Sequence, residues 1–207
     1  MTILLVRHGE TEWNLEGRYQ GRLDSPLTPR GAAQAQTLGQ LLARLAGAEA
    51  MPIVASPLGR ARHTADIIAA CLGNHSRLRL DDRLREISLG SWDGLTRKEI
   101  ALRAPALFTG EGGGEWYFRS PDGETSDGFA ARIGAWLDEW RDADVVVVAH
   151  GVVSRVLRGL YAGLDRRVAL TLPVPQDRIF RLCAGSIDEL AADNADRRLA
   201  DFSGGRR

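Results

Sequence analysis

Residues 4–14 read LLVRHGETEWN, and this stretch indicates both the fold and a site. The apolar run at 3–6 predicts a short strand buried on both faces, as in the middle of a parallel sheet. Arg7, His8 and Gly9 follow directly, so a guanidinium, an imidazole and a residue without a side chain stand at the carboxyl end of that strand. Ligands bind at this edge in open α/β sheets. The stretch therefore predicts a ligand site at the end of a central strand.

Two further apolar runs, at 51–55 and 145–149, predict buried strands that also end in polar turns. After the first of them, Ser56 and Pro57 mark the start of a helix that carries Arg60 in its first turn. The unpaired amides and the positive dipole end of a helix disfavour a cation there unless an anion binds. The other run ends at His150, which is followed by Gly151 and a helical pattern. The residues at these two turns indicate a phosphate-binding site.

In a parallel sheet, Arg7, His8, Arg60 and His150 converge at one edge. Two guanidinium groups match phosphate oxygens in pairs, which favours a phosphoryl ligand. One imidazole can attack phosphorus as the neutral base, and the other can stay protonated and donate to an equatorial oxygen. Residues 77–89 alternate polar and apolar side chains well enough for an edge strand or an extended segment. Glu86, within this segment, is the carboxylate expected to protonate the leaving group and then to activate water.

The rest of the chain predicts elements that surround this edge. Residues 12–27 have the composition of a loop at the rim of the site. Further helices are expected from Thr28 to about Gly47, at 96–104, from a cap at Thr125 or Ser126, and, as noted above, after Gly151. A late strand is expected at 179–183, at or near an edge of the sheet.

The least regular segment, 105–125, is rich in glycine and carries Trp116, Tyr117 and Phe118. It predicts either a lid over the ligand or a surface excursion whose aromatic side chains pin it to the core. Residues 188–207 are polar, and the last few are expected to be disordered. The 207 residues suit one domain, 1–207, with the lid-like insertion and a flexible tail.

Composition argues against several classes of function. The 27 basic and 27 acidic side chains cancel, so no overall field gathers nucleic acid or an anionic membrane. Neither a signal peptide nor a membrane span is expected, and Cys71 and Cys183 suit free thiols in the cytoplasm. The remaining histidines, His63 and His75, have no metal-ligand spacing, so we expect no metal and no cofactor.

Five motifs together resemble the histidine phosphatase superfamily, also called the phosphoglycerate mutase-like family. They are, in order, RHGETEWNLEGRYQGRLDSPLTPRG (7–31), SPLGRARHTA (56–65), LREISLGSWDG (84–94), SPDGETSDGF (120–129) and VVVVAHGVVSR (145–155). The resemblance covers residues 3 to about 160.

The resemblance implies a three-layer α/β sandwich with a mostly parallel central sheet flanked by helices. It also implies a metal-independent enzyme with His8 as the phosphohistidine nucleophile and Glu86 as proton donor. The phosphate pocket would comprise Arg7, Arg60 and His150, with Gly151 beside it. Asn14 and the backbone of Gln20 and Gly21 would add contacts to a small phosphorylated substrate.

Within the family, three positions favour a phosphatase over a cofactor-dependent phosphoglycerate mutase. Mutases carry a Tyr three residues after the acid, an adjacent Arg pair in the long insertion and an Asn shortly after the second His-Gly. Here these places hold Leu89, a lone Arg119 and Val152. A mutase, and a non-catalytic relative that only binds phosphorylated ligands, are the alternatives. The sequence leaves a monomer and a homodimer equally open.

Overall fold

A computed structural model describes residues 1–108 and 115–191, which form six strands and seven α-helices. The strands are β1 (Thr2–Arg7), β2 (Ile53–Ala55), β3 (Leu78–Leu80), β4 (Val145–Ala149), β5 (Ile179–Cys183) and β6 (Ser186–Leu190). The helices are α1 (Glu12–Leu15), α2 (Pro29–Ala43), α3 (Gly59–Leu72), α4 (Arg97–Arg103), α5 (Ser126–Glu139), α6 (Gly151–Ala162) and α7 (Arg166–Thr171).

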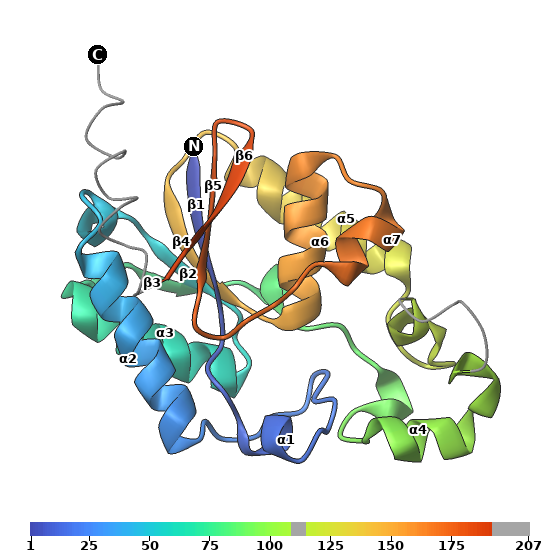
Figure 1. The fold of residues 1–207 in the computed structure, drawn as a ribbon. Coiled ribbons are helices and arrows are strands. Elements are labelled where there is room, and N and C mark those ends of the chain that lie inside the picture. The colour runs from blue at the N-terminus through green and yellow to red at the C-terminus, as the bar shows by residue number, and fades with distance from the viewer. Residues whose placement is uncertain (109–114, 192–207) are drawn as a thin grey trace.

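The strands form one sheet in the order β3-β2-β4-β1-β5-β6 (Figure 1). The pairs β3–β2, β2–β4 and β4–β1 are parallel, whereas β1–β5 and β5–β6 are antiparallel. The predicted α/β fold with a mostly parallel central sheet is therefore confirmed. The three strands whose apolar runs indicated burial, β1, β2 and β4, lie side by side in the middle of the sheet.

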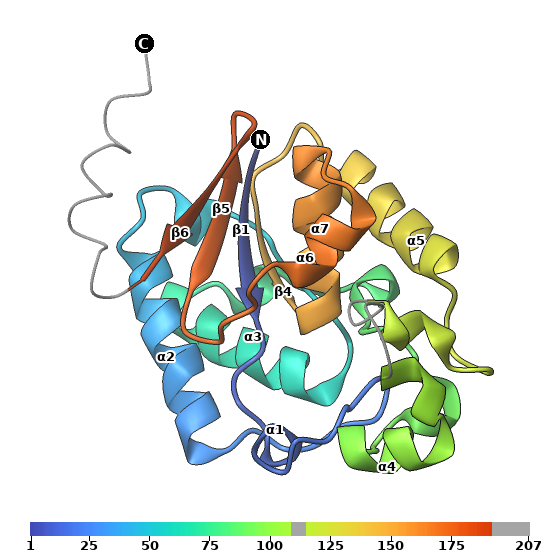
Figure 2. The same ribbon diagram turned by 45° about the vertical axis from the view of Figure 1, so that its right-hand side comes forward.

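Helices cover both faces of the sheet, because successive side chains of a strand point to opposite sides. Leu4 and Val6 of β1 belong to the core that packs beneath α2 and α3. Ile3 and Leu5 belong to the core beneath α5 and α6, which includes the fully buried Trp136. Figures 1 and 2 show the resulting three layers, with α2 and α3 on one face and α5 and α6 on the other.

The predicted helix starts agree with the structure except at α3. Thr28 caps α2, since its Oγ1 accepts a hydrogen bond of 2.9 Å from the Gly31 amide, and Thr125 caps α5. The start predicted at Ser56 and Pro57 is wrong, because α3 begins at Gly59. The α2 helix also ends at Ala43, before Gly47, whose φ of 86° opens a separate short turn.

Three local predictions need correction, and one helix was not predicted. The edge strand predicted within 77–89 is present at the edge of the sheet, but it covers only Leu78–Leu80. The rim loop contains the short helix α1, and α7 was not predicted. Residues 188–190 were expected to be part of a polar tail, but they belong to β6, which pairs with β5. An edge strand such as β6 remains partly exposed, so its composition is polar and lacks a strand signal.

Parts of two predictions lie outside the described residues. These are residues 109–114 of the predicted lid and the tail at 192–207. Of the lid aromatics that are described, Trp116 is 5% exposed and belongs to the core, and Phe118 packs against Phe129. Among the described helices, none has the length and apolar character needed to cross a membrane.

Candidate active site

Backbone hydrogen bonds continue past the ends of the central strands and bring their following residues together. The His8 amide donates to the Ala149 carbonyl at 2.9 Å, and the Ser56 amide donates to the Val148 carbonyl at 3.0 Å. His8, Ser56 and His150 therefore stand next to one another at the carboxyl edge of β1, β2 and β4. The ring centroids of the two histidines are 5.2 Å apart.

His8 is held as a neutral base. Burial, followed by the charges of Arg60 and Arg7, keeps the pKa of His8 well below its ordinary value of 6.5. Its Nδ1 lies 2.8 Å from the Gly9 carbonyl, which can only accept, so Nδ1 carries the proton. Its Nε2 accepts a hydrogen bond of 3.3 Å from Arg60 Nε. The unprotonated nitrogen of His8 thus faces the guanidinium of Arg60.

Arg60 is the second residue of α3, and its side chain is almost fully buried. Nη1 donates to the Leu23 carbonyl at 2.6 Å and to Asp24 Oδ1 at 2.8 Å. Nη2 donates to the Gly21 carbonyl at 2.8 Å. Loop residues 21–24 therefore hold the plane of this guanidinium, which leaves Nε directed at His8.

Arg7 ends β1 and reaches the same pocket from another side. Its Nη1 donates to the Val174 carbonyl at 2.6 Å, and its buried Nε has no hydrogen-bond partner among the described residues. Burial lowers the pKa of Arg7 to about 10, so the side chain stays cationic at neutral pH. A buried donor without a partner is rare and costly, which makes Nε available to an anion.

His150 precedes α6 and is fully buried. Its Nε2 lies 2.8 Å from Ser56 Oγ, and its Nδ1 has no partner among the described residues. Burial, with Arg60 as the largest nearby charge, holds the pKa of His150 well below 6.5. In the arrangement described, desolvation beside two arginines favours the neutral ring, and protonation of this imidazole beside a phosphoryl group stays a prediction.

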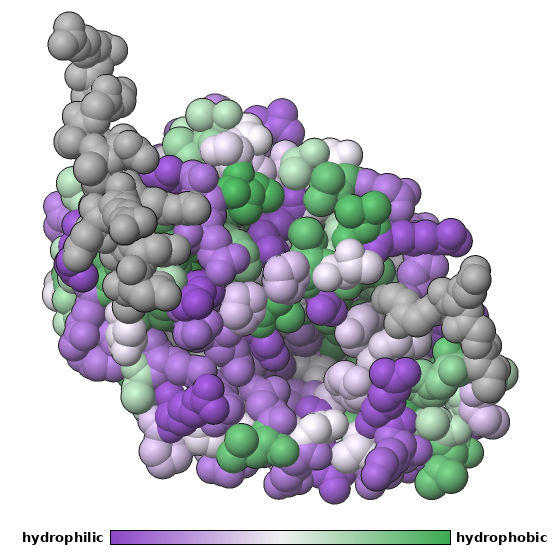
Figure 3. Space-filling model, viewed as in Figure 1, coloured by the Kyte–Doolittle hydropathy of each residue, from purple (hydrophilic) through white to green (hydrophobic). Residues whose placement is uncertain are grey.

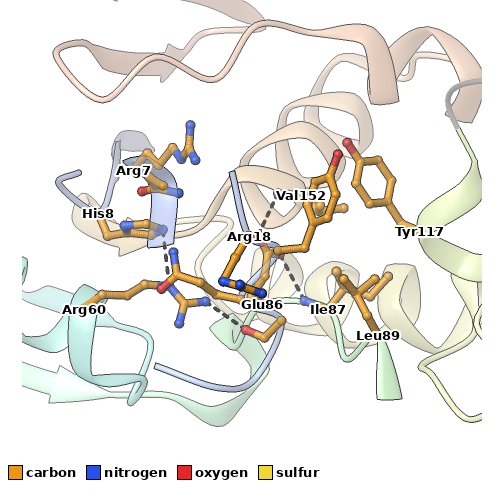
Figure 4. Close-up of a pocket in the computed structure, with 13 residues that line it drawn as sticks. Arg7, His8, Arg18, Arg60, Glu86, Ile87, Leu89, Tyr117 and Val152 are labelled. Atoms are coloured by element: carbon orange, nitrogen blue, oxygen red, sulfur yellow. Dashed lines mark hydrogen bonds between the residues drawn. The ribbon is translucent and has the colours of Figure 1, made fainter. Parts of the chain in front are cut away.

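The Glu86 carboxylate is fixed by two backbone amides. Oε1 accepts from its neighbour Ile87 at 3.0 Å, and Oε2 accepts from Val152 at 3.1 Å, in the first turn of α6. The amino end of a helix favours a carboxylate through its dipole and its unpaired amides. Figure 4 shows Glu86 between Arg60 on one side and Ile87 on the other.

Asn14, Gln20 and Gly21 come from the loop after β1. The Asn14 Oδ1 accepts from the Thr11 amide at 3.1 Å and from Gln176 Nε2 at 3.0 Å, which leaves its Nδ2 to donate elsewhere. Gln20 donates to Thr11 Oγ1 at 2.7 Å. Gly21 has a φ of +51°, and its carbonyl accepts from Arg60, so this glycine acts through its backbone.

These side chains surround one pocket with a cavity volume of about 90 Å³. Its lining consists of Arg7, His8, Asn14, Arg18, Tyr19, Gln20, Gly21, Arg60, Glu86, Ile87, Leu89, Tyr117 and Val152. The surface is hollowed between the side of α6 and α7 and the side of α1 and α4 (Figure 3). His150 lies behind this lining, and Gly151 lies next to Arg7.

Nothing in the sequence indicated several residues that hold the site. Ser56 was interpreted only as a helix start, although its hydroxyl binds His150. Gln176 donates to the His8 carbonyl at 3.1 Å from a segment 168 residues away. Thr64 accepts from the Gly9 amide at 3.1 Å. These contacts join segments that only the folded sheet brings together, so no local pattern marks them.

The remaining histidines lie apart from this pocket. His63 lies next to a separate depression beside Asp24, and His75 lies in a short turn before β3. Within residues 1–108 and 115–191, no group of three His, Cys, Asp or Glu side chains is arranged to hold a metal ion. The expectation of a metal-independent site stays a prediction.

Comparisons with known proteins agree with this arrangement. A family model described as the histidine phosphatase superfamily (branch 1) matches residues 3–185. A probable phosphoglycerate mutase, GpmB, from Photorhabdus laumondii is 38% identical over 183 residues, which are 82% of this chain and 80% of that protein.

Two solved structures are similar over most of their length. A mycobacterial glucosyl-3-phosphoglycerate phosphatase solved with VO3 is 28% identical, has a TM-score of 0.72, and matches over 92% of this chain and 97% of that one. Bacillus stearothermophilus YhfR is 31% identical, with a TM-score of 0.73 over 92% and 96% of the two chains. The family model, the sequence relative and the shared fold all lead to one assignment: this chain belongs to the histidine phosphatase superfamily, branch 1.

Proposed function

We propose that the protein is a metal-independent phosphomonoesterase that hydrolyses a small phosphorylated metabolite through a phosphohistidine on His8. The observation that carries the proposal is the state of His8. Its Nδ1 proton is committed to the Gly9 carbonyl, and its Nε2 is unprotonated beside Arg60. A neutral imidazole with a fixed tautomer is a competent nucleophile toward phosphorus.

The phosphoryl group would be bound between two guanidiniums. Arg60 Nε, the unpaired Arg7 Nε and Asn14 Nδ2 can donate to its oxygens. His150 adds a fourth donor if Ser56 donates to its Nε2, because the ring proton is then on Nδ1. The Leu58 amide already donates to Ser56 Oγ at 3.3 Å, which leaves the hydroxyl proton for His150. A dianion bound here would also raise the pKa of His150.

The reaction takes two steps. In the first, His8 Nε2 attacks phosphorus, the bond from phosphorus to the ester oxygen breaks, and Glu86 protonates the leaving alkoxide. In the second, the ionised Glu86 takes a proton from water, the resulting hydroxide attacks the phosphohistidine, and inorganic phosphate leaves. His8 and Glu86 both return to their starting states. Arg7 and Arg60 would stabilise the charge on the equatorial oxygens throughout.

Phosphoglycerate mutase is the second candidate, because the sequence relative bears that name. Two features favour hydrolysis. Leu89 and Val152, which replace the Tyr and Asn of mutases, line the pocket with apolar atoms. The lone Arg119 is exposed and does not line the pocket. Because the pocket has few polar groups to retain an intermediate for transfer back, water would attack the phosphohistidine.

The third candidate, a relative that only binds phosphorylated ligands, would lack a catalytic group, yet His8, Glu86, His150 and both arginines are all present.

The test is a rapid acid quench after brief mixing with ³²P-labelled substrate, followed by analysis of the protein-bound label. We expect an acid-labile, alkali-stable label on the wild type, none on His8→Ala, and an undiminished label on His75→Ala, which removes an exposed histidine far from the pocket. Label that survives acid, or label that persists in His8→Ala, would overturn the proposal.

Mutase activity is separated by a second assay with 3-phosphoglycerate, with and without bisphosphoglycerate. Release of inorganic phosphate supports the phosphatase, and formation of the 2-isomer that depends on bisphosphoglycerate supports the mutase. Binding without labelling of His8 or turnover, across a panel of phosphorylated metabolites, would support the non-catalytic alternative.

A further inference from the structure

The pocket has two chemically different sides. Arg7, His8 and Arg60 line one side, and Ile87, Leu89 and Tyr117 line the other (Figure 4). If phosphorus is bound at the first side, as the proposed function requires, the leaving group extends toward the second. The character of that second side then decides which alcohols can leave.

Tyr117 lines this side of the pocket, and its hydroxyl is hydrogen-bonded. The hydroxyl accepts a hydrogen bond of 3.2 Å from Arg155 Nη1, and Arg155 Nε is held in turn by the Leu172 carbonyl at 2.8 Å. The ring centroids of Tyr117 and the buried Trp116 are 4.3 Å apart, and those of Trp116 and Tyr19 are 4.6 Å apart. The ring of Tyr117 is therefore held in place before any ligand arrives.

Three aliphatic side chains complete this apolar wall. Leu89 and Val152 are 2% and 6% exposed, and Ile87 is 1% exposed, so packing against the core fixes the position of each. They line the pocket together with the two tyrosines. None of the five side chains carries a charge at neutral pH.

The cation on this part of the lining, Arg18, is already paired. Its Nε lies 2.8 Å from Glu16 Oε2, and its Nη1 lies 3.1 Å from Glu99 Oε2 and 3.0 Å from the Gly94 carbonyl. One guanidinium with two carboxylates leaves this group of three side chains with a net negative charge. A leaving group that carries its own carboxylate or phosphate would meet repulsion from this net charge.

We propose that this side of the pocket selects phosphomonoesters of uncharged, apolar or aromatic alcohols and discriminates against leaving groups that carry a carboxylate or a second phosphate. The inference rests on the proposed function and gives its substrate class. Two structural features carry it: the apolar wall around Tyr117, and an Arg18 whose charge is neutralised by Glu16 and Glu99.

The experiment compares two aryl esters, 4-ethylphenyl phosphate and 4-(carboxymethyl)phenyl phosphate, in which a terminal carboxylate replaces a terminal methyl group, by phosphate release and by labelling of His8. The charge is remote from the scissile bond, so the two alcohols leave with similar ease. We expect kcat/KM to be roughly tenfold or more higher for the ethyl ester, since an unpaired carboxylate in a pocket costs a large factor in binding. Tyr117→Leu should raise KM for the ethyl ester about two- to tenfold through loss of the aromatic contact.

The double variant Glu16→Gln/Glu99→Gln tests the part played by Arg18. Gln at position 99 can keep the capping box that Glu99 forms with Thr96 at the start of α4, so the local fold is retained. With Arg18 freed, kcat/KM for the carboxylated ester should rise about three- to tenfold relative to the ethyl ester, and added salt should reduce the gain. Glu49→Gln, an exposed change far from the pocket, is the control and should leave the ratio unchanged.

The outcomes separate the inference from the function beneath it. If both esters label His8 and are hydrolysed at similar rates, or the carboxylated ester is preferred, the substrate class is wrong and the phosphatase stands. An unchanged ratio in the double variant overturns the role given to Arg18. If neither ester, nor any other phosphomonoester tried, labels His8 or releases phosphate, the proposed function fails and the inference fails with it.

Discussion

Asp24 and Arg60 contact each other through both side chain and backbone. Asp24 Oδ1 accepts from Arg60 Nη1 at 2.8 Å and from the Arg60 amide at 3.3 Å, while Oδ2 accepts from the Gly59 amide at 2.6 Å. One carboxylate thus caps the amino end of α3 and orients the guanidinium that faces His8. Asp24 therefore couples the amino end of α3 to the orientation of Arg60 in the proposed phosphate site.

Asp24→Asn should therefore reduce catalysis through Arg60. Asparagine retains one acceptor oxygen for the helix amides but loses the charge that orients the guanidinium. We expect kcat/KM to fall about tenfold, consistent with the loss of one charge-assisted hydrogen bond. Steady-state kinetics, together with inhibition by inorganic phosphate, measures the effect.

Arg60→Lys is the variant with which Asp24→Asn is compared. It keeps the charge but cannot contact His8 and the Gly21 and Leu23 carbonyls at the same time, so a loss of roughly a hundredfold is expected. A loss in Asp24→Asn that is explained by a lower melting temperature alone, with normal kinetics of the folded fraction, would contradict the positioning role of Asp24.

Glu86→Gln should slow the substrates with poor leaving groups most. An alkoxide needs a proton as it departs, whereas an aryl oxide leaves without much help, so alkyl phosphates should lose about a hundredfold or more and aryl phosphates far less. The measurement is kcat over a series of esters of graded alcohol acidity. Equal losses along the series would mean that Glu86 only holds Val152 and Ile87 in place.

Gln176→Leu should weaken phosphate binding although Gln176 does not line the pocket. Its Nε2 lies 3.1 Å from the His8 carbonyl and 3.0 Å from Asn14 Oδ1, so it fixes the amide orientation that turns Asn14 Nδ2 toward the ligand. We expect KM and the inhibition constant of inorganic phosphate to rise about two- to tenfold, with a smaller change in kcat. Gln40→Leu, an exposed change on α2, is the matched control. An effect on kcat alone would argue against this role.

Acidification below pH 6.5 should destabilise the fold through His8 and His150. Both folded-state pKa values lie well below 6.5, so the unfolded chain binds more protons between the folded value and 6.5. The free energy of unfolding then falls as the pH drops through 6.5, by up to about 1.4 kcal/mol per histidine for each pH unit, until the folded value is reached. Above pH 7 these two groups should add no slope.

Urea unfolding between pH 5.5 and 7.5 measures this dependence. His8→Gln and His150→Gln should each have a shallower slope than the wild type, and the double variant should be shallower still. If the wild type shows no change in the free energy of unfolding across this range, the two imidazoles are not held neutral in the folded protein.

Much of the fold follows from short-range patterns in the sequence. The apolar runs of β1, β2 and β4 predict buried strands, and the residues after them belong to one edge because parallel strands end together. The polar edge strand β6 and the helices α1 and α7 lack such a pattern and were missed. Of the two interpretations of segment 105–125, the core contact is confirmed for Trp116, whereas the lid over the ligand stays a prediction, although Tyr117 lines the pocket.

By itself, the sequence determined which side chains stand at the ends of the central strands, because burial and turn chemistry are properties of a few adjacent residues. Only the tertiary structure decided their chemical state and their supports. The pKa of His150 is lowered because burial depends on all of its surroundings, and Gln176 reaches His8 because β5 pairs beside β1. Arg18 pairs with Glu16, two residues before it in the chain, and with Glu99, which only the fold brings to it from α4.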